Sequence, residues 1–133
     1  MSTKVILAAA AAAVVCAAVP AAAHHSFAMF DQKKIMALQG TVRQFQWTNP
    51  HAFIELEALG GQRWSIELNS PNNLKRQGWT RVSLKAGDQV TVRINPLRDG
   101  SHGGLFLDVK LPSGRTLDSG LPKDGKPINV PQL

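Results

Sequence analysis

The four histidines of this chain are the residues whose types and spacing suggest chemistry. Two of them, His24 and His25, directly follow the alanines of "PAAAHHSF", where small residues form a site that a signal peptidase accepts. Cleavage after Ala23 would make His24 the first residue, with a free α-amine and an imidazole on the same residue. These two nitrogens can chelate one metal ion, so the sequence predicts a metal site at the new N-terminus.

An imidazole from another histidine would complete a T-shaped set of three nitrogen ligands. The candidates are His51, His25 and His102, and His51 is favoured because the Asn-Pro dipeptide before it fixes where its side chain emerges. Copper(II) suits amine and imidazole nitrogens in tetragonal geometry, and the arrangement resembles the histidine brace of copper proteins. Cleavage after Ala21 would instead place His24 third, which is similar to the amino-terminal motif that binds copper and nickel.

A purely structural interpretation of His51 stands beside the metal-binding one. In "WTNPH" the proline restricts the residue before it and favours a turn. The ring of a histidine at such a turn can hydrogen-bond a nearby carbonyl group. Both interpretations place the imidazole outside the core, because the alternation of the next strand puts Ala52, Ile54 and Leu56 on the opposite face.

Residues 1–23 have the pattern of a secretory signal peptide. Lys4 precedes an apolar run over residues 5–19, and three alanines end the segment. The run is shorter than the roughly 20 apolar residues of a membrane span, so we expect a periplasmic or secreted protein with no stable membrane anchor after cleavage. Cys16, the only cysteine, leaves with this peptide. The mature chain therefore has no disulfide, thiolate ligand or cysteine nucleophile.

Composition limits what the mature chain can be. Without the first 23 of 133 residues, 110 remain, which suits one domain. The formal net charge falls from +6 to +5 with the loss of Lys4. Because the basic residues are scattered, with no tract that resembles a nucleic-acid patch, we expect no nucleic acid as a partner.

Apolar residues alternate with polar ones in most of the mature chain, which predicts strands. "AFIELEAL" and "RWSIEL" are half-buried strands joined by a tight turn at "LGGQ". "QVTVRI" and "LFLDVKL" repeat the pattern around a loop over residues 95–104 that contains His102. In the last of these strands the expected inward residues are Leu105, Leu107, Val109 and Leu111.

The first strand, "ALQGTVRQFQW", changes phase part-way along. Leu38, Gly40 and Val42 share one face, whereas Phe45 and Trp47 fall on the other. One extra residue near "RQ" would turn both sets inward, which is the effect of a β-bulge. The sequence therefore predicts a bent first strand that can pair with two different neighbours.

One short helix is expected within "NSPNNLKRQGWT". Ser70 suits the N-cap, Pro71 the first helical position and Gly78 the left-handed position after the helix. Three strands, a helix and two strands are the order of an all-β, five-stranded, OB-fold-like Greek-key barrel. The expected divisions of the chain are a signal peptide (1–23), an N-terminal segment (24–36), the OB-fold-like domain (37–117) and a flexible C-terminal arm (118–133), which is rich in proline and glycine.

Several short motifs occur together in the mature chain: "AHHSF", "GTV", "WTNPH", and "SPNNLKRQGWT" followed by "LKAGDQVTV". In combination they resemble a widespread family of small exported bacterial proteins that is catalogued as a domain of unknown function. The resemblance implies a periplasmic or secreted single domain and supplies no activity.

The chemistry of the remaining residues favours binding over catalysis. Glu55, Glu57 and Glu67 fall on outward strand positions, and no nucleophile is paired with a base. We therefore expect a non-catalytic binding module with an unidentified ligand or protein partner, and a copper-binding protein using His24 and His51 as the alternative. In an OB-fold the second and third strands commonly supply the binding face. Its expected side chains are Phe53, Arg63, Ser65 and Glu67.

Overall fold

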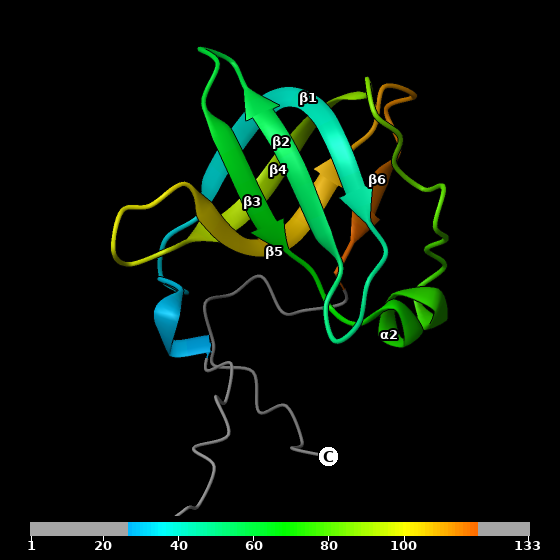
Figure 1. Ribbon diagram of the computed structural model, residues 1–133, viewed down its shortest axis with the longest axis horizontal. Coiled ribbons are helices and arrows are strands. Elements are labelled where there is room, and N and C mark those ends of the chain that lie inside the picture. Colours follow the sequence, from blue (N-terminus) through cyan, green and yellow to red (C-terminus); the bar gives the residue numbers. More distant parts are fainter. Residues whose placement is uncertain (1–26, 120–133) are drawn as a thin grey trace, which may run out of the picture.

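Six strands and one short α-helix make up the part of the chain that the computed structural model describes, residues 27–119 (Figure 1). The predicted signal peptide, His24, His25 and residues 120–133 of the predicted arm lie outside these residues. The elements in chain order are a 3-10 turn η2 (Phe27–Met29), β1 (Met36–Gln46), β2 (Phe53–Ala58), β3 (Arg63–Glu67), α2 (Pro71–Arg76), β4 (Gln89–Pro96), β5 (Gly103–Lys110) and β6 (Thr116–Asp118).

The first five strands close into a barrel. β1 pairs with β2 on one side and with β4 on the other, β2 pairs with β3, and β4 pairs with β5, all antiparallel. A parallel pairing of β3 with β5 completes the ring. The predicted five-stranded barrel with one short helix between the third and fourth strands is confirmed, and Figure 1 shows this helix at one end of the barrel.

The expected bulge in the first strand is present at Arg43. Val42 lies opposite Leu56 and Gln44 lies opposite Glu55, so Arg43 is the extra residue on β1. Val42 is completely buried, and the residues after the bulge, Phe45 and Trp47, are half-buried and pack against the core. The bulge therefore turns both parts of the strand toward the core, as the phase change predicted.

A second bulge, which the sequence did not predict, lies between β4 and β5. Val92 is opposite Val109 and Ile94 is opposite Phe106, so three steps on β5 match two on β4. The core contains Phe106 and Val109, whereas Leu105 and Leu107 are buried without belonging to it. The prediction that Leu105 and Leu107 point into the core is therefore wrong, because one extra residue reverses the alternation between them and Val109.

The helix closes one end of the barrel, with the predicted cap residues at both of its ends. The Ser70 hydroxyl accepts a hydrogen bond from the Asn73 backbone N–H at 3.3 Å, and Pro71 is the first helical residue. Gly78 follows with a φ of 88°, a conformation that favours glycine. Leu74 from the helix and Trp79 just after it are buried in the core. The helix is thus held mainly by its apolar contacts with the barrel.

β6 is a sixth strand that the sequence did not predict. It pairs antiparallel with β5 and buries Leu117 in the core. The Trp79 indole N–H donates to the Asp118 carbonyl at 3.0 Å, and the Ser119 N–H donates to the Leu107 carbonyl at 3.0 Å. Asp118, placed by the sequence at the start of the arm, is therefore the last residue of a strand.

At Gly40, β1 lies so close to β2 that a side chain has no room. It lies opposite Ala58 on β2 and Val90 on β4. A Cβ atom at Gly40 would lie 2.3 Å from the Glu57 carbonyl oxygen and 2.9 Å from the Ala58 Cα. Both atoms belong to the backbone, so neither can move away without shifting the strand.

We predict that Gly40→Ala lowers the free energy of unfolding by about 2–4 kcal/mol, because the added methyl group forces β1 and β2 apart. Urea denaturation measures the change. Gln39→Ala, at the exposed neighbouring position, serves as the control and should change stability by less than about 0.5 kcal/mol. Equal stability of the two variants would show that the close approach is not required.

Candidate functional site

His51 lies in the connection between β1 and β2, immediately after a cis Asn49-Pro50 peptide bond. Its Nδ1 atom is 3.0 Å from the Leu68 carbonyl oxygen and 3.6 Å from Glu67 Oε1. The Thr48 hydroxyl donates to the His51 carbonyl at 2.8 Å. The carbonyl contact expected from the structural interpretation of His51 is confirmed, with a partner at the end of β3.

This contact also selects the tautomer of the ring. A carbonyl oxygen only accepts hydrogen bonds, so the neutral His51 ring carries its proton on Nδ1 and its lone pair on Nε2. Metal-bound histidines are commonly oriented by such a hydrogen bond from the second nitrogen. His51 therefore has the tautomer of a metal ligand, although residues 27–119 contain no group of three or more His, Cys, Asp or Glu side chains that could hold a metal ion.

His102 is exposed on the loop between β4 and β5, where it covers a buried tryptophan. Its ring stacks on Trp64 with centroids 4.7 Å apart and an interplanar angle of 21°. The Trp64 indole nitrogen is buried and has no hydrogen-bond partner among the described residues. The His102 carbonyl accepts from the Ser65 N–H at 3.1 Å. These contacts fix the loop against β3 and give His102 a structural role.

The structure does not bring His51 and His102 together. The ring of His51 forms a hydrogen bond with the Leu68 carbonyl, and the carbonyl of His102 accepts a hydrogen bond from the Ser65 N–H. Three residues of extended chain separate these two points, which corresponds to about 10 Å. The two histidines also approach β3 from its two different neighbours, β2 and β5. A site containing both would need a rearrangement of the barrel.

The described chain begins beside the loop that carries His102. Phe30 forms a β-bridge with Leu97, and the Arg98 N–H donates to the Met29 carbonyl at 2.9 Å. The Arg98 side chain donates to the Ala28 carbonyl at 3.0 Å. These contacts fix the point from which His24 and His25 extend, but both histidines lie outside the described residues, so their predicted role as ligands stays a prediction.

The binding face predicted on β2 and β3 is a network of polar groups that bind one another. The Ser65 hydroxyl donates to Glu55 at 2.8 Å. Glu57 accepts from Arg43 at 2.6 Å and lies 3.6 Å from Arg63. Arg63 and Ser65 of the predicted face are therefore engaged with neighbouring side chains, and its role in binding stays a prediction.

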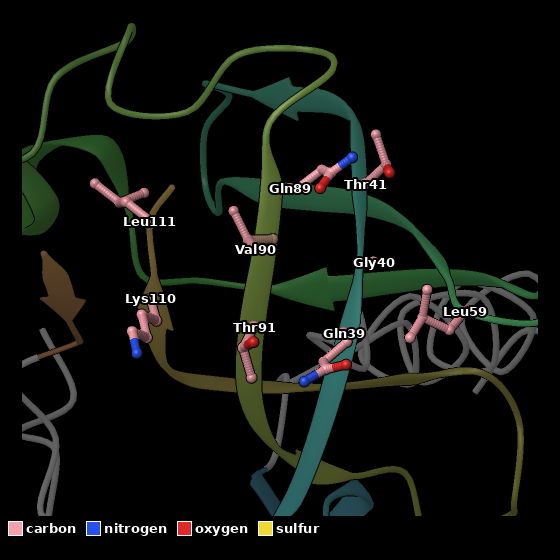
Figure 2. A pocket seen from close by; sticks show the side chains of 9 residues that line it. All are labelled: Gln39, Gly40, Thr41, Leu59, Gln89, Val90, Thr91, Lys110 and Leu111. Carbon is pink, nitrogen blue, oxygen red and sulfur yellow. The ribbon is translucent and has the colours of Figure 1, made fainter. Parts of the chain in front are cut away.

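A groove lies on the other side of the barrel, over β1, β4 and β5 (Figure 2). Its volume is about 390 Å³, within the range of about 300–1,000 Å³ that is usual for small-molecule sites. Leu59 and Leu111 lie at its margins, and Gly40 and Val90 lie between its polar side chains. The polar lining consists of Gln39 and Thr41 from β1, Gln89 and Thr91 from β4, and Lys110 from β5.

Strand register explains why these five side chains gather. Gln39 is opposite Thr91, which is opposite Lys110, and this row crosses three strands. Thr41 is opposite Gln89 in a second, parallel row. None of the five side chains makes a hydrogen bond or ion pair with another described residue. The groove therefore presents two amides, two hydroxyls and one ammonium group whose binding capacity is unused within residues 27–119.

Among residues 27–119, Lys110 is the only charged residue that lines the groove. Arg93, two residues beyond Thr91 on β4, is engaged elsewhere: its Nε donates to Asp108 Oδ1 at 2.8 Å, and a second bond joins Nη2 to Oδ2. The hydrogen bonds and charge of Asp108 raise the pKa of the Arg93 guanidinium above its usual value. The electrostatic character of the groove therefore depends on one ammonium group.

Sequence reasoning missed the groove completely. "LQGT" and "QVT" have polar residues at alternate positions, which is also the pattern of any solvated strand face. Only the pairing of β1 with β4 places the two glutamines and two threonines side by side. The sequence did predict an OB-fold, and the strand order of that fold could have indicated that β1 and β4 are neighbours.

Comparison with known proteins assigns the chain to a protein family. A family model described as "Family of unknown function (DUF6152)" matches residues 10–107. The chain belongs to this family. The matched part of this DUF6152 member includes both "WTNPH" and the helix sequence, so the resemblance found in the motifs is confirmed. No curated protein and no solved structure matches the chain. No helix within residues 27–119 is long and apolar enough to cross a membrane.

The stacking of His102 on Trp64 leads to a spectroscopic prediction. In His102→Ala, one face of the Trp64 indole becomes exposed to water, so its N–H resonance should shift in a heteronuclear NMR spectrum. The Trp79 resonance, held by its bond to the Asp118 carbonyl, should stay in place. Because His102 is exposed, the loss of stability should be no more than about 1 kcal/mol. An unchanged Trp64 resonance would show that the rings do not stack in solution.

Proposed function

We propose that this DUF6152 member is a periplasmic or secreted binding module that takes a small polar ligand in the groove of β1, β4 and β5. One observation carries this proposal: five hydrogen-bonding side chains meet in a concave site and have no partner among the described residues. A few convergent polar groups in a depression of this volume are typical of small-molecule sites. A protein partner would usually need about 800 Å² of contact on each side, more than a single groove supplies.

The lining of the groove supports binding without catalysis. Thr41 and Thr91 supply hydroxyl groups, but no histidine or carboxylate of residues 27–119 lines the groove to act as their base. Lys110 is exposed and surrounded by neutral groups. A nucleophile with a base, or a pair of carboxylates, is therefore missing from the described lining.

The proposed location depends on the N-terminal sequence. A basic residue, an apolar run and small residues before His24 form the pattern of a cleaved secretory signal. Export would bring the groove into contact with extracytoplasmic solutes and with the polymers of the cell envelope. Intact mass of the exported protein tests both the cleavage and its position.

Blocking the groove should abolish ligand binding. We predict that Gln39→Tyr fills the groove and lowers the affinity for ligands found by ligand-detected NMR screening of small polar compounds by at least tenfold. Gln44→Tyr introduces the same side chain at an exposed position of β1 outside the groove and should leave affinity unchanged. Bound compounds should be recovered chemically intact after incubation with the protein. Equal binding by the two variants would place the binding site elsewhere.

Copper binding is the second candidate function, and the orientation of His51 favours it. The bond from Nδ1 to the Leu68 carbonyl, with Glu67 at 3.6 Å, leaves Nε2 as the nitrogen with the lone pair. In this proposal the amine and imidazole of a processed His24 would supply two further nitrogens, a set that suits copper(II). The copper site would then be separate from the groove, because neither His51 nor His102, the two histidines that the structure describes, lines the groove.

We predict that His51→Ala weakens copper(II) binding by the correctly processed protein at least tenfold, whereas His102→Ala leaves it unchanged. Binding should weaken as pH falls through about 6.5, because protons then compete with the metal for imidazole. Titration with copper(II), with spectroscopy reporting nitrogen ligation, measures both effects. Tight binding that does not depend on His51 would remove this residue from the site.

A further inference from the structure

We infer that the ligand of the groove is an acidic saccharide, a sugar that carries several hydroxyl groups and one carboxylate per unit. This inference rests on the proposed function and specifies its ligand class. It follows from three properties of the groove: the chemical type of its polar groups, the arrangement of its apolar margins, and its single positive charge.

The neutral polar groups suit hydroxyl-rich ligands. Each glutamine amide has both donors and an acceptor, and each threonine hydroxyl is both a donor and an acceptor. A sugar hydroxyl has the same double character, so it can bond with Gln39 or Gln89 and with a neighbouring threonine at once. Within each row the partners on β1 and β4 lie a strand spacing apart, about 4.8 Å. Hydroxyls at neighbouring positions of a sugar ring can therefore be bound from two strands.

The margins of the groove suit the carbon skeleton of a sugar. Leu59, which is 72% exposed, lies at one margin and Leu111 at another. The Thr41 and Thr91 side chains add methyl groups between them. A pyranose ring has C–H groups on its faces, and burying them against these side chains contributes apolar contact area. The part of the chain that the structure describes places no aromatic side chain in the groove, so we expect weak binding, with a Kd of about 0.1–1 mM.

The charge of the groove suits a carboxylate. Lys110 ends the row that begins at Gln39 and passes through Thr91. Two strand spacings, about 10 Å, thus separate its strand from the opposite end of the row, so a ligand can place a carboxylate at Lys110 and hydroxyls at the glutamines. Lysine binds phosphate as well as carboxylate, but phosphate and sulfate sites commonly add arginine forks or several backbone N–H groups. Here the nearest arginine of β4, Arg93, is already bonded to Asp108.

The position of the groove argues against an extended peptide. Peptides that add to a sheet bind through main-chain groups at a strand edge. At the groove the backbones of β1 and β4 pair with each other, with Gly40 opposite Val90. The groups offered to a ligand are therefore side chains on the face of the sheet, which favours a ligand recognised through its own hydroxyl and carboxylate groups.

NMR titration of the uniformly labelled protein with trigalacturonic acid tests the inference, and the neutral maltotriose is the comparison ligand. We expect saturable shifts at the amides of Gly40, Thr41, Gln89, Thr91 and Lys110 with the acidic sugar, and at least tenfold weaker binding of the neutral one. Lys110→Ala should lower affinity for trigalacturonic acid at least fivefold, whereas Lys75→Ala, an exposed lysine on α2, should not. Thermal denaturation of both variants confirms that they are folded.

Equal affinities for the two sugars, an unaffected Lys110→Ala variant, or shifts confined to residues outside the groove would each overturn the inference. The proposed function has a separate test. If trigalacturonic acid does not bind but other polar compounds do, and Gln39→Tyr abolishes their binding, the groove remains a binding site while acidic saccharides are excluded. If Gln39→Tyr affects the binding of no compound, both the proposed function of the groove and the inference about acidic saccharides are wrong.

Discussion

The double pairing of β1 is the constraint on which the rest of the structure depends. Around Gly40 and Thr41 the strand pairs with β2 and β4 at the same time, and beyond these residues it follows β2 alone. The bulge at Arg43 supplies the bend, and the missing side chain at Gly40 supplies the close approach to Ala58. Without both features the five strands would form an open sheet with two exposed edges.

The same pairing produces two outer faces with different chemistry. On β1, β2 and β3 the polar side chains satisfy one another, as Glu57 does with Arg43 and Arg63. On β1, β4 and β5 the register brings together amide and hydroxyl groups with the single charge of Lys110, and the nearby Arg93 is occupied by Asp108. Exposed ion pairs contribute little to stability. Within residues 27–119 the polar groups of the first face bind one another, whereas the five polar side chains of the second make no such bonds, and the proposed binding function rests on this contrast.

The sequence predicted most of the fold because its alternation is clear wherever one strand face is polar. The bulge in β1 was predictable since Phe45 and Trp47 are large residues on the wrong parity. The bulge in β5 could not be predicted. Leu105, Phe106 and Leu107 are all apolar, so they show no alternation whose interruption would reveal a bulge. β6 has only three residues, too few for a pattern. The groove could not be predicted because it depends on which strands are neighbours, and His24 and His25 lie outside the described residues.

Gly40 also limits how this protein can evolve. It lies between the two polar rows of the groove, and any side chain there would collide with the backbone of β2. Mutation therefore cannot alter the middle of the groove without endangering the barrel. The outward positions around it, such as Gln39 and Gln89, are exposed and can change at little cost to folding. Relatives built on this barrel could thus acquire new ligand preferences by exchanging rim residues while the scaffold stays the same.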